Sequence, residues 1–171
     1  MWSVALLLLV LILVLSGCNH PGSTTSSLSS SDTSIESSTD DDSPMSQNQI
    51  AATSPVFAYW HTKFPGDQWA ALAKGDLNND GRADLVVVYG TPEDKYYFVV
   101  VLNLANGFQI TDPTDAPPED QVLRIFDMDD APPNEFSVAG QKDNQVGMAI
   151  FHLENGVVTL LITEGYGECC G

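Results

Sequence analysis

The chain has 171 residues, with 6 basic side chains against 23 acidic ones and a formal net charge of −17 at pH 7. This balance argues against nucleic acid and anionic lipid surfaces as partners and favours cations or basic proteins. Residues 55–171 are enough for one modest core and therefore for one domain.

The chain begins with an apolar run, Val4–Leu15, which is shorter than the roughly 20 residues of a membrane span. It closes with Leu15-Ser16-Gly17-Cys18, which resembles the bacterial lipobox, although no basic residue precedes the run. We expect residues 1–17 to be a lipoprotein signal peptide and Cys18 to carry the lipid. An uncleaved hydrophobic anchor is the alternative. Both place the remainder on the extracytoplasmic face of the cell membrane, with the anchor in the lipid bilayer.

Residues 18–54 contain the lipidated cysteine and a Ser- and Thr-rich stretch with one acidic cluster, Asp40-Asp41-Asp42. Apolar side chains are too few there to offset the conformational entropy lost on ordering. We therefore expect a disordered tether between the anchor and a folded domain.

Residues 55–164 contain short runs rich in β-branched and aromatic residues, separated by Gly, Asn, Asp and Pro, which predicts strands. The runs are Leu85–Tyr89, Tyr96–Leu104, Phe108–Ile110, Val122–Phe126, Glu135–Gly140, Val146–Leu153 and Val157–Thr163. Asn106-Gly107 and Asn155-Gly156 indicate tight hairpins, because Asn-Gly tolerates positive φ angles. We interpret Gln68–Lys74 as a further strand, and no stretch has a convincing helical period. The sequence predicts an all-β domain.

A candidate calcium loop follows Gln68–Lys74. Oxygen-bearing side chains alternate along it, and a glycine stands at its sixth position, as a wrapped Ca²⁺ ion requires. The predicted ligands are the side chains of Asp76, Asn78, Asp80 and Asp84, with the backbone carbonyl of Arg82. Position 12 is Val87, within a strand, so the loop is not an EF-hand. An Asp/Asn/Gly turn without metal is the alternative. The loop resembles the calcium-binding repeats of the FG-GAP and VCBS families.

A second copy of the unit lies about fifty residues further along. Asp127, Asp129 and Glu135 match Asp76, Asn78 and Asp84. Ala131 and Pro132 replace Asp80 and Gly81 of the first loop, so we expect the second loop to keep the turn and lose the metal. The fold prediction is thus a small two-repeat antiparallel β domain, since a propeller needs at least four blades.

The chain ends with a predicted flexible tail, residues 165–171, that contains Cys169 and Cys170. Two neighbouring thiolates suit a large, soft, thiophilic metal or organometal. A strained vicinal disulfide and two sulfurs of no consequence are the alternatives. A thiol oxidoreductase is disfavoured, because no base, helix N-terminus or Cys-x-x-Cys pattern activates either sulfur.

The lipobox, the Ser-rich tether, the acidic loop and the Cys-Cys ending together resemble the SaoC family. That resemblance implies an accessory of an ABC-type transporter, in contact with its membrane subunit, that captures an organometal outside the membrane. Gly171 follows the pair, so the cysteines are not at the carboxy terminus itself. We expect no enzyme activity. The alternative function is a calcium-stabilised FG-GAP/VCBS-like binding or adhesion module with an incidental tail.

Overall fold

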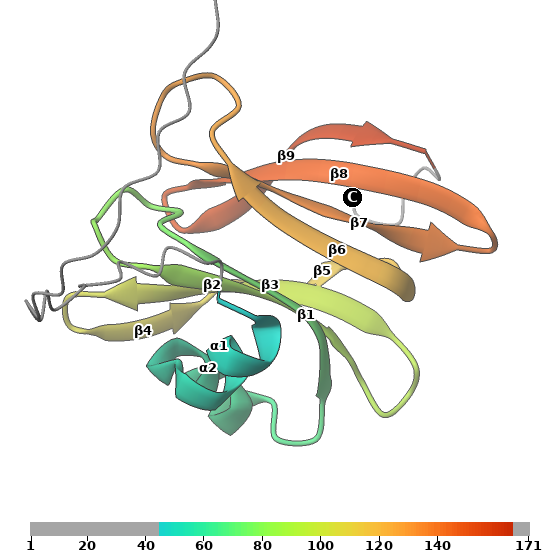
Figure 1. Ribbon diagram of the computed structural model, residues 1–171, viewed down its shortest axis with the longest axis horizontal. Helices are drawn as coiled ribbons and strands as arrows, with labels where there is room; N and C mark the ends of the chain where they lie inside the picture. The colour runs from blue at the N-terminus through green and yellow to red at the C-terminus, as the bar shows by residue number, and fades with distance from the viewer. Residues whose placement is uncertain (1–44, 166–171) are drawn as a thin grey trace, which may run out of the picture. The chain divides into compact units, whose positions relative to one another are not determined.

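A computed structural model describes residues 45–165 of the protein. Two short helices precede nine strands, and the strands form two antiparallel sheets (Figure 1). The elements are α1 Gln47–Thr53, α2 Pro55–Lys63, β1 Gln68–Gly75, β2 Asp84–Gly90, β3 Tyr96–Leu104, β4 Gly107–Ile110, β5 Thr114–Asp115, β6 Glu119–Phe126, β7 Glu135–Lys142, β8 Gln145–Glu154 and β9 Val157–Glu164. No helix in this range is long and apolar enough to span a bilayer.

The two helices correct the sequence analysis, which assigned residues up to 54 to the tether and expected no helix. Ser46 and Ser54 cap them, since each hydroxyl accepts a hydrogen bond from the backbone N–H three residues on, at 3.3 Å. Ile50 is the one buried side chain of α1, so the segment has no apolar stripe to reveal it. Helices this short depend on tertiary packing, which composition and periodicity do not show.

The strands confirm the prediction of a two-repeat antiparallel β domain. The first unit has the strand order β1-β2-β3-β4, with the two-residue strand β5 beside β3, and the second has the order β6-β7-β8-β9. Every predicted strand is present, including Gln68–Lys74 as part of β1. At the β8–β9 hairpin Asn155 and Gly156 have φ angles of 53° and 80°, as a type I′ turn requires.

The registers show which positions of the two units are equivalent. Leu85 pairs with Val101 in the first sheet, as Phe136 pairs with Phe151 in the second. Leu85 packs against the helices, however, whereas Phe136 packs against the first sheet. Equivalent faces of the two units therefore point in the same direction. The face of the first sheet that is turned away from the helices packs against the face of the second sheet that contains Phe136.

The stacking creates two apolar cores and three layers, with the helices below the first sheet and the second sheet above it (Figure 1). Between the sheets, the rings of Phe98 and Phe151 lie 4.9 Å apart and those of Phe136 and Phe151 lie 5.5 Å apart. Between the helices and the first sheet, Trp60 is fully buried against Tyr89. The opposite side of the second sheet, here called the outer face, has no layer over it in residues 45–165.

Candidate metal centre

The first acidic loop connects β1 to β2 and is wound around the Asp76 carboxylate. Oδ1 of Asp76 accepts hydrogen bonds from the backbone N–H groups of Asn78 at 3.3 Å and Asp80 at 3.2 Å. Oδ2 accepts another from Gly81 at 2.8 Å. Asn78 Oδ1 also accepts from the Asp80 N–H, at 3.1 Å. Side-chain oxygens at the first and third positions thus replace a backbone ladder and hold the turn.

Two residues of this loop have left-handed backbone conformations. Asn79 has a φ of 58° and Gly81 a φ of 79°. Asparagine tolerates this region and glycine enters it at no steric penalty. Gly81, which the sequence predicted at the sharp turn, therefore adopts its backbone conformation without the strain that a side chain would bring.

Asp84 closes the loop and is fully buried. Its Oδ2 accepts from the Leu77 N–H at 2.9 Å, and its Oδ1 accepts from the Asn103 N–H at 2.8 Å, so it ties the loop to β3. Burial raises the pKa of the Asp84 carboxyl, and the nearby carboxylates of Asp80 and Asp76 raise it further, against the lowering effect of the two hydrogen bonds. A cation in the loop would relieve this repulsion between carboxylates.

Asp80 has a basic neighbour within the loop. Its Oδ2 lies 3.4 Å from an Arg82 guanidinium nitrogen, and its Oδ1 accepts from the Arg82 N–H at 2.9 Å. The side chains are partly exposed, at 42% for Arg82 and 25% for Asp80, so the ion pair contributes little to stability. The sequence analysis assigned Arg82 a carbonyl ligand and did not foresee that its side chain pairs with another predicted ligand.

The second loop, between β6 and β7, keeps the turn as predicted. Glu135 Oε2 accepts from the Met128 N–H at 2.8 Å, as Asp84 does from Leu77. The Ala131 N–H donates to Asp127 at 3.1 Å and to Asp129 at 3.0 Å, as the Asp80 N–H does in the first loop. The bonds donated by the Gly81 and Arg82 N–H groups have no counterpart, because the prolines at positions 132 and 133 lack an N–H.

The second loop also brings three acidic side chains together. Ligand oxygens of Asp127, Asp129 and Glu135 all lie within 4.8 Å of one another. The sequence analysis expected this loop to lose the metal because an oxygen and a glycine were replaced. In the structure the replaced positions leave the three carboxylates close together, and Pro133 stands where the first loop has Arg82. This closeness could not be read from the spacing of the residues.

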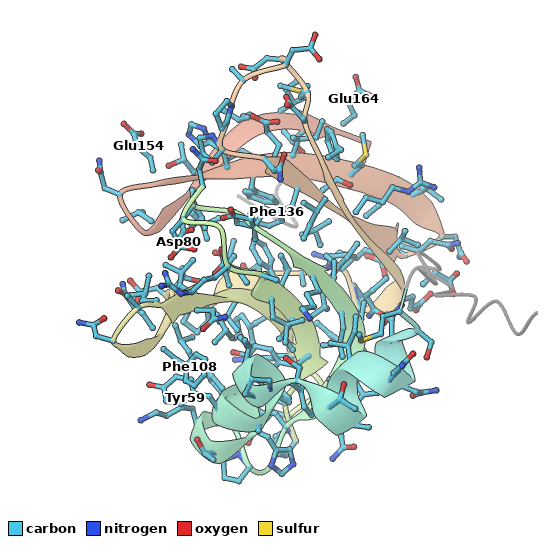
Figure 2. All side chains as sticks on the ribbon, turned by 60° about the vertical axis from the view of Figure 1, so that its left-hand side comes forward. Tyr59, Asp80, Phe108, Phe136, Glu154 and Glu164 are labelled. Atoms are coloured by element: carbon cyan, nitrogen blue, oxygen red, sulfur yellow. The ribbon has the colours of Figure 1, made fainter. Side chains whose placement is uncertain are left out.

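The two loops touch each other. Asn134 Nδ2 donates to the backbone carbonyl of Asp76 at 3.0 Å, across 58 residues of chain. Figure 2 shows Asp80 at one side of the molecule, the side on which Glu154 also lies. The stacking of the units in one sense explains the contact, since it places equivalent loops side by side. Asn134 was missed in the sequence, where nothing marks it apart from its position in a turn.

Residues 68–95 match the model of the FG-GAP repeat family. The matched segment contains β1, the first loop and β2, so it covers the loop geometry described above. The match supports the predicted resemblance to FG-GAP repeats and a β-repeat binding or adhesion module. No curated protein and no solved structure matches the chain. The resemblance to the SaoC family therefore gains no support.

Several predicted sites lie outside the described residues. They are the signal peptide, the lipid-attachment residue Cys18 and the thiol pair Cys169 and Cys170. Lipidation of Cys18, and metal or organometal capture at the pair, stay predictions from the sequence.

Proposed function

We propose that the protein is a calcium-stabilised β-repeat binding module. The first loop would hold one Ca²⁺ through the side chains of Asp76, Asn78, Asp80 and Asp84 and the carbonyl of Arg82. The observation that carries the proposal is the loop's hydrogen-bond pattern within the FG-GAP match, in which the backbone N–H groups of Asp80 and Gly81 turn around the side-chain oxygens of Asp76 and Asn78. Carboxylate, amide and carbonyl oxygens are the ligands that calcium takes.

The charge of the loop favours a divalent cation over an empty turn. Three of the four predicted side-chain ligands are acidic, and Arg82 is the one basic residue between Lys74 and Lys95. Burial raises the pKa of the Asp84 carboxyl, and repulsion from Asp80 and Asp76 adds to that rise. A bound cation reverses this electrostatic relationship, because it stabilises the ionised form of every carboxylate that faces it.

The contacts of the loop explain how an ion there would stabilise the whole module. Asp84 reaches the Asn103 N–H in β3, and the Asp76 carbonyl accepts from Asn134 of the second unit. Fixing the positions of Asp76 and Asp84 would therefore fix β1, β2, β3 and the second loop together. Calcium would act as a structural ion, and the partner would bind elsewhere on the β surface.

Attachment to the extracytoplasmic side of the membrane through Cys18 belongs to the same proposal. It rests on the apolar run and on Leu15-Ser16-Gly17-Cys18. Metabolic labelling with a fatty acid tests it: wild type should take up label and Cys18→Ala should not. Equal labelling of the two would contradict the anchor and leave the calcium site untouched.

Calorimetric titration and thermal unfolding with calcium or a chelator test the metal site. Calcium at a hundredfold excess over its dissociation constant should add about 2.7 kcal/mol to the free energy of unfolding. Asp80→Ala should remove this gain, whereas Asp129→Ala in the second loop is the matched control and should keep it. Melts that coincide with and without calcium in wild type would contradict the proposal. A gain lost only in Asp129→Ala would place the ion in the second loop instead.

A further inference from the structure

The outer face of the second sheet is apolar. Three of its large apolar side chains are substantially exposed, Val122 by 48%, Met148 by 37% and Ile162 by 42%, whereas Ile150 near the centre of the face is 9% exposed. A depression of about 490 Å³ lies on this face, and its lining is largely apolar. It is lined by Arg124, Ile125, Phe126, Ser137, Met148 and Ile150. Contiguous apolar surface on an otherwise strongly acidic protein marks an interaction site.

Comparison with the equivalent face of the first sheet indicates what kind of surface would cover the outer face. In the first sheet the positions equivalent by strand register to Ser137, Ala139, Met148 and Ile150 are Val86, Val88, Phe98 and Val100. These first-unit side chains are buried in the core between the sheets. The outer face of the second sheet is thus the counterpart of a face that another sheet covers.

A second copy of the chain cannot cover it by continuing the stack. Continuation would require the free copy to offer the face that contains Leu85 and Val87. That face is already covered by α1 and α2, whose Ile50, Val56 and Trp60 are buried against it. Two copies can therefore meet through this surface only by placing their outer faces together, which is the isologous contact of a twofold dimer.

Charges on the face complement each other under such symmetry. Arg124 lies on the edge strand β6 and pairs with Ser137, and Glu164 lies on the opposite edge strand β9 and pairs with Met148. Paired residues share a face of a sheet. Figure 2 agrees, since Glu164 lies beyond the second sheet on the side away from Phe136. A twofold axis parallel to the strands places β6 of one copy over β9 of the other, with Arg124 level with Ile162 and Glu164 two residues, roughly 7 Å, further along β9. The long Arg124 side chain can span this offset, so the symmetric pair with Glu164 would form twice.

The size of the face is sufficient for a specific contact. Four strands about 4.8 Å apart, each contributing roughly eight residues at about 3.3 Å, cover about 500 Å² on each copy. Both copies together then bury about 1,000 Å², the lower limit for a specific interface. We propose that the outer face of the second sheet is the contact surface of a face-to-face homodimer.

Sedimentation velocity of the full chain in non-ionic detergent tests the dimer by charge exchange. Wild type should sediment as two chains at micromolar concentration. Arg124→Glu or Glu164→Arg alone places like charges at both meeting points and should weaken dimerisation at least tenfold. The exchanged double variant restores opposite charges and should return the dissociation constant to within about threefold of wild type.

Lys63→Glu, on the exposed side of α2, is the matched control and should leave dimerisation unchanged. A wild type that stays monomeric at a hundred micromolar would overturn the proposal, and the face would then belong to a different partner. Single variants that dimerise as well as wild type would also overturn it. So would a double variant no better than either single variant, because a loss caused only by disturbed folding is not rescued by exchanging the charges.

Discussion

The two units share strand order and loop geometry but differ in how many faces they bury. In the first unit, β2 is buried on both faces, and every residue from Leu85 to Tyr89 is at most 2% exposed. In the second unit the described residues cover only one face, and Met148 of β8 and Ile162 of β9 on the outer face are 37% and 42% exposed. The same repeat is thus a core element in one position and an end element in the other, because stacked repeats take most of their stability from their neighbours.

The two loops also differ, since the first has more hydrogen bonds within it than the second. The first loop has Gly81, an arginine and three N–H groups donating to Asp76. The second keeps the bonds to its first, third and closing acidic residues although the glycine is absent. The turn therefore depends on those acidic or amide side chains, and the glycine affects only how the backbone passes through its sixth position.

The largest expected loss of stability comes from a substitution on the covered face of the second sheet, compared with one on its outer face. Phe151→Ala removes a ring that contacts Phe98 and Phe136 and should lower the free energy of unfolding by about 3–5 kcal/mol. Met148→Ala on the outer face should lower it by less than about 1 kcal/mol in the monomer. Urea unfolding of both variants measures the difference. Equal losses would show that the outer face is already covered.

The next largest difference in stability is expected between substitutions of the two residues that close the loops, Asp84 and Glu135. Asp84→Asn presents only one acceptor oxygen to two backbone N–H groups and should cost about 1–3 kcal/mol in the presence of chelator. Glu135→Gln keeps an acceptor for the single Met128 N–H and should cost less than about 1 kcal/mol. Chemical unfolding of the matched pair decides. The comparison fails if Glu135→Gln is the more destabilised variant.

The sequence was sufficient for most strands because they are runs rich in β-branched and aromatic residues between turn residues, whereas the two-residue strand β5 was missed. It did not indicate which way the strands face, since Leu85–Tyr89 is apolar throughout and has no alternation to assign. Both faces of β2 are in fact buried, one by helices that the sequence did not reveal. The first loop could be predicted because its ligands are adjacent in sequence. The closeness of the second-loop carboxylates depends on three-dimensional geometry, and so does the contact from Asn134.

A smaller effect tests the role of Gly81. Its φ of 79° lies where a side chain is strained, so Gly81→Ala should cost about 1 kcal/mol although the space around it is open. Gly66→Ala is the control, since its surroundings are equally open and its φ is outside that region. That change should be neutral or slightly stabilising. Thermal unfolding in chelator compares the two, and equal shifts would mean that strain at Gly81 does not matter.

The smallest expected effect on stability concerns Arg82, whose side chain and carbonyl have different roles in the proposed site. Truncation in Arg82→Ala removes the 3.4 Å pair with Asp80 and leaves the backbone carbonyl in place. Because an exposed ion pair contributes little, the free energy of unfolding in chelator should change by less than about 1 kcal/mol. Calcium should nevertheless bind more tightly, since the guanidinium no longer competes for Asp80 and a positive charge has left the site. Calorimetric titration should show a several-fold lower dissociation constant in Arg82→Ala and an unchanged one in Lys95→Ala, which removes a lysine from beyond β2. Weaker calcium binding in Arg82→Ala would mean that the arginine side chain supports the loop rather than competing with the ion.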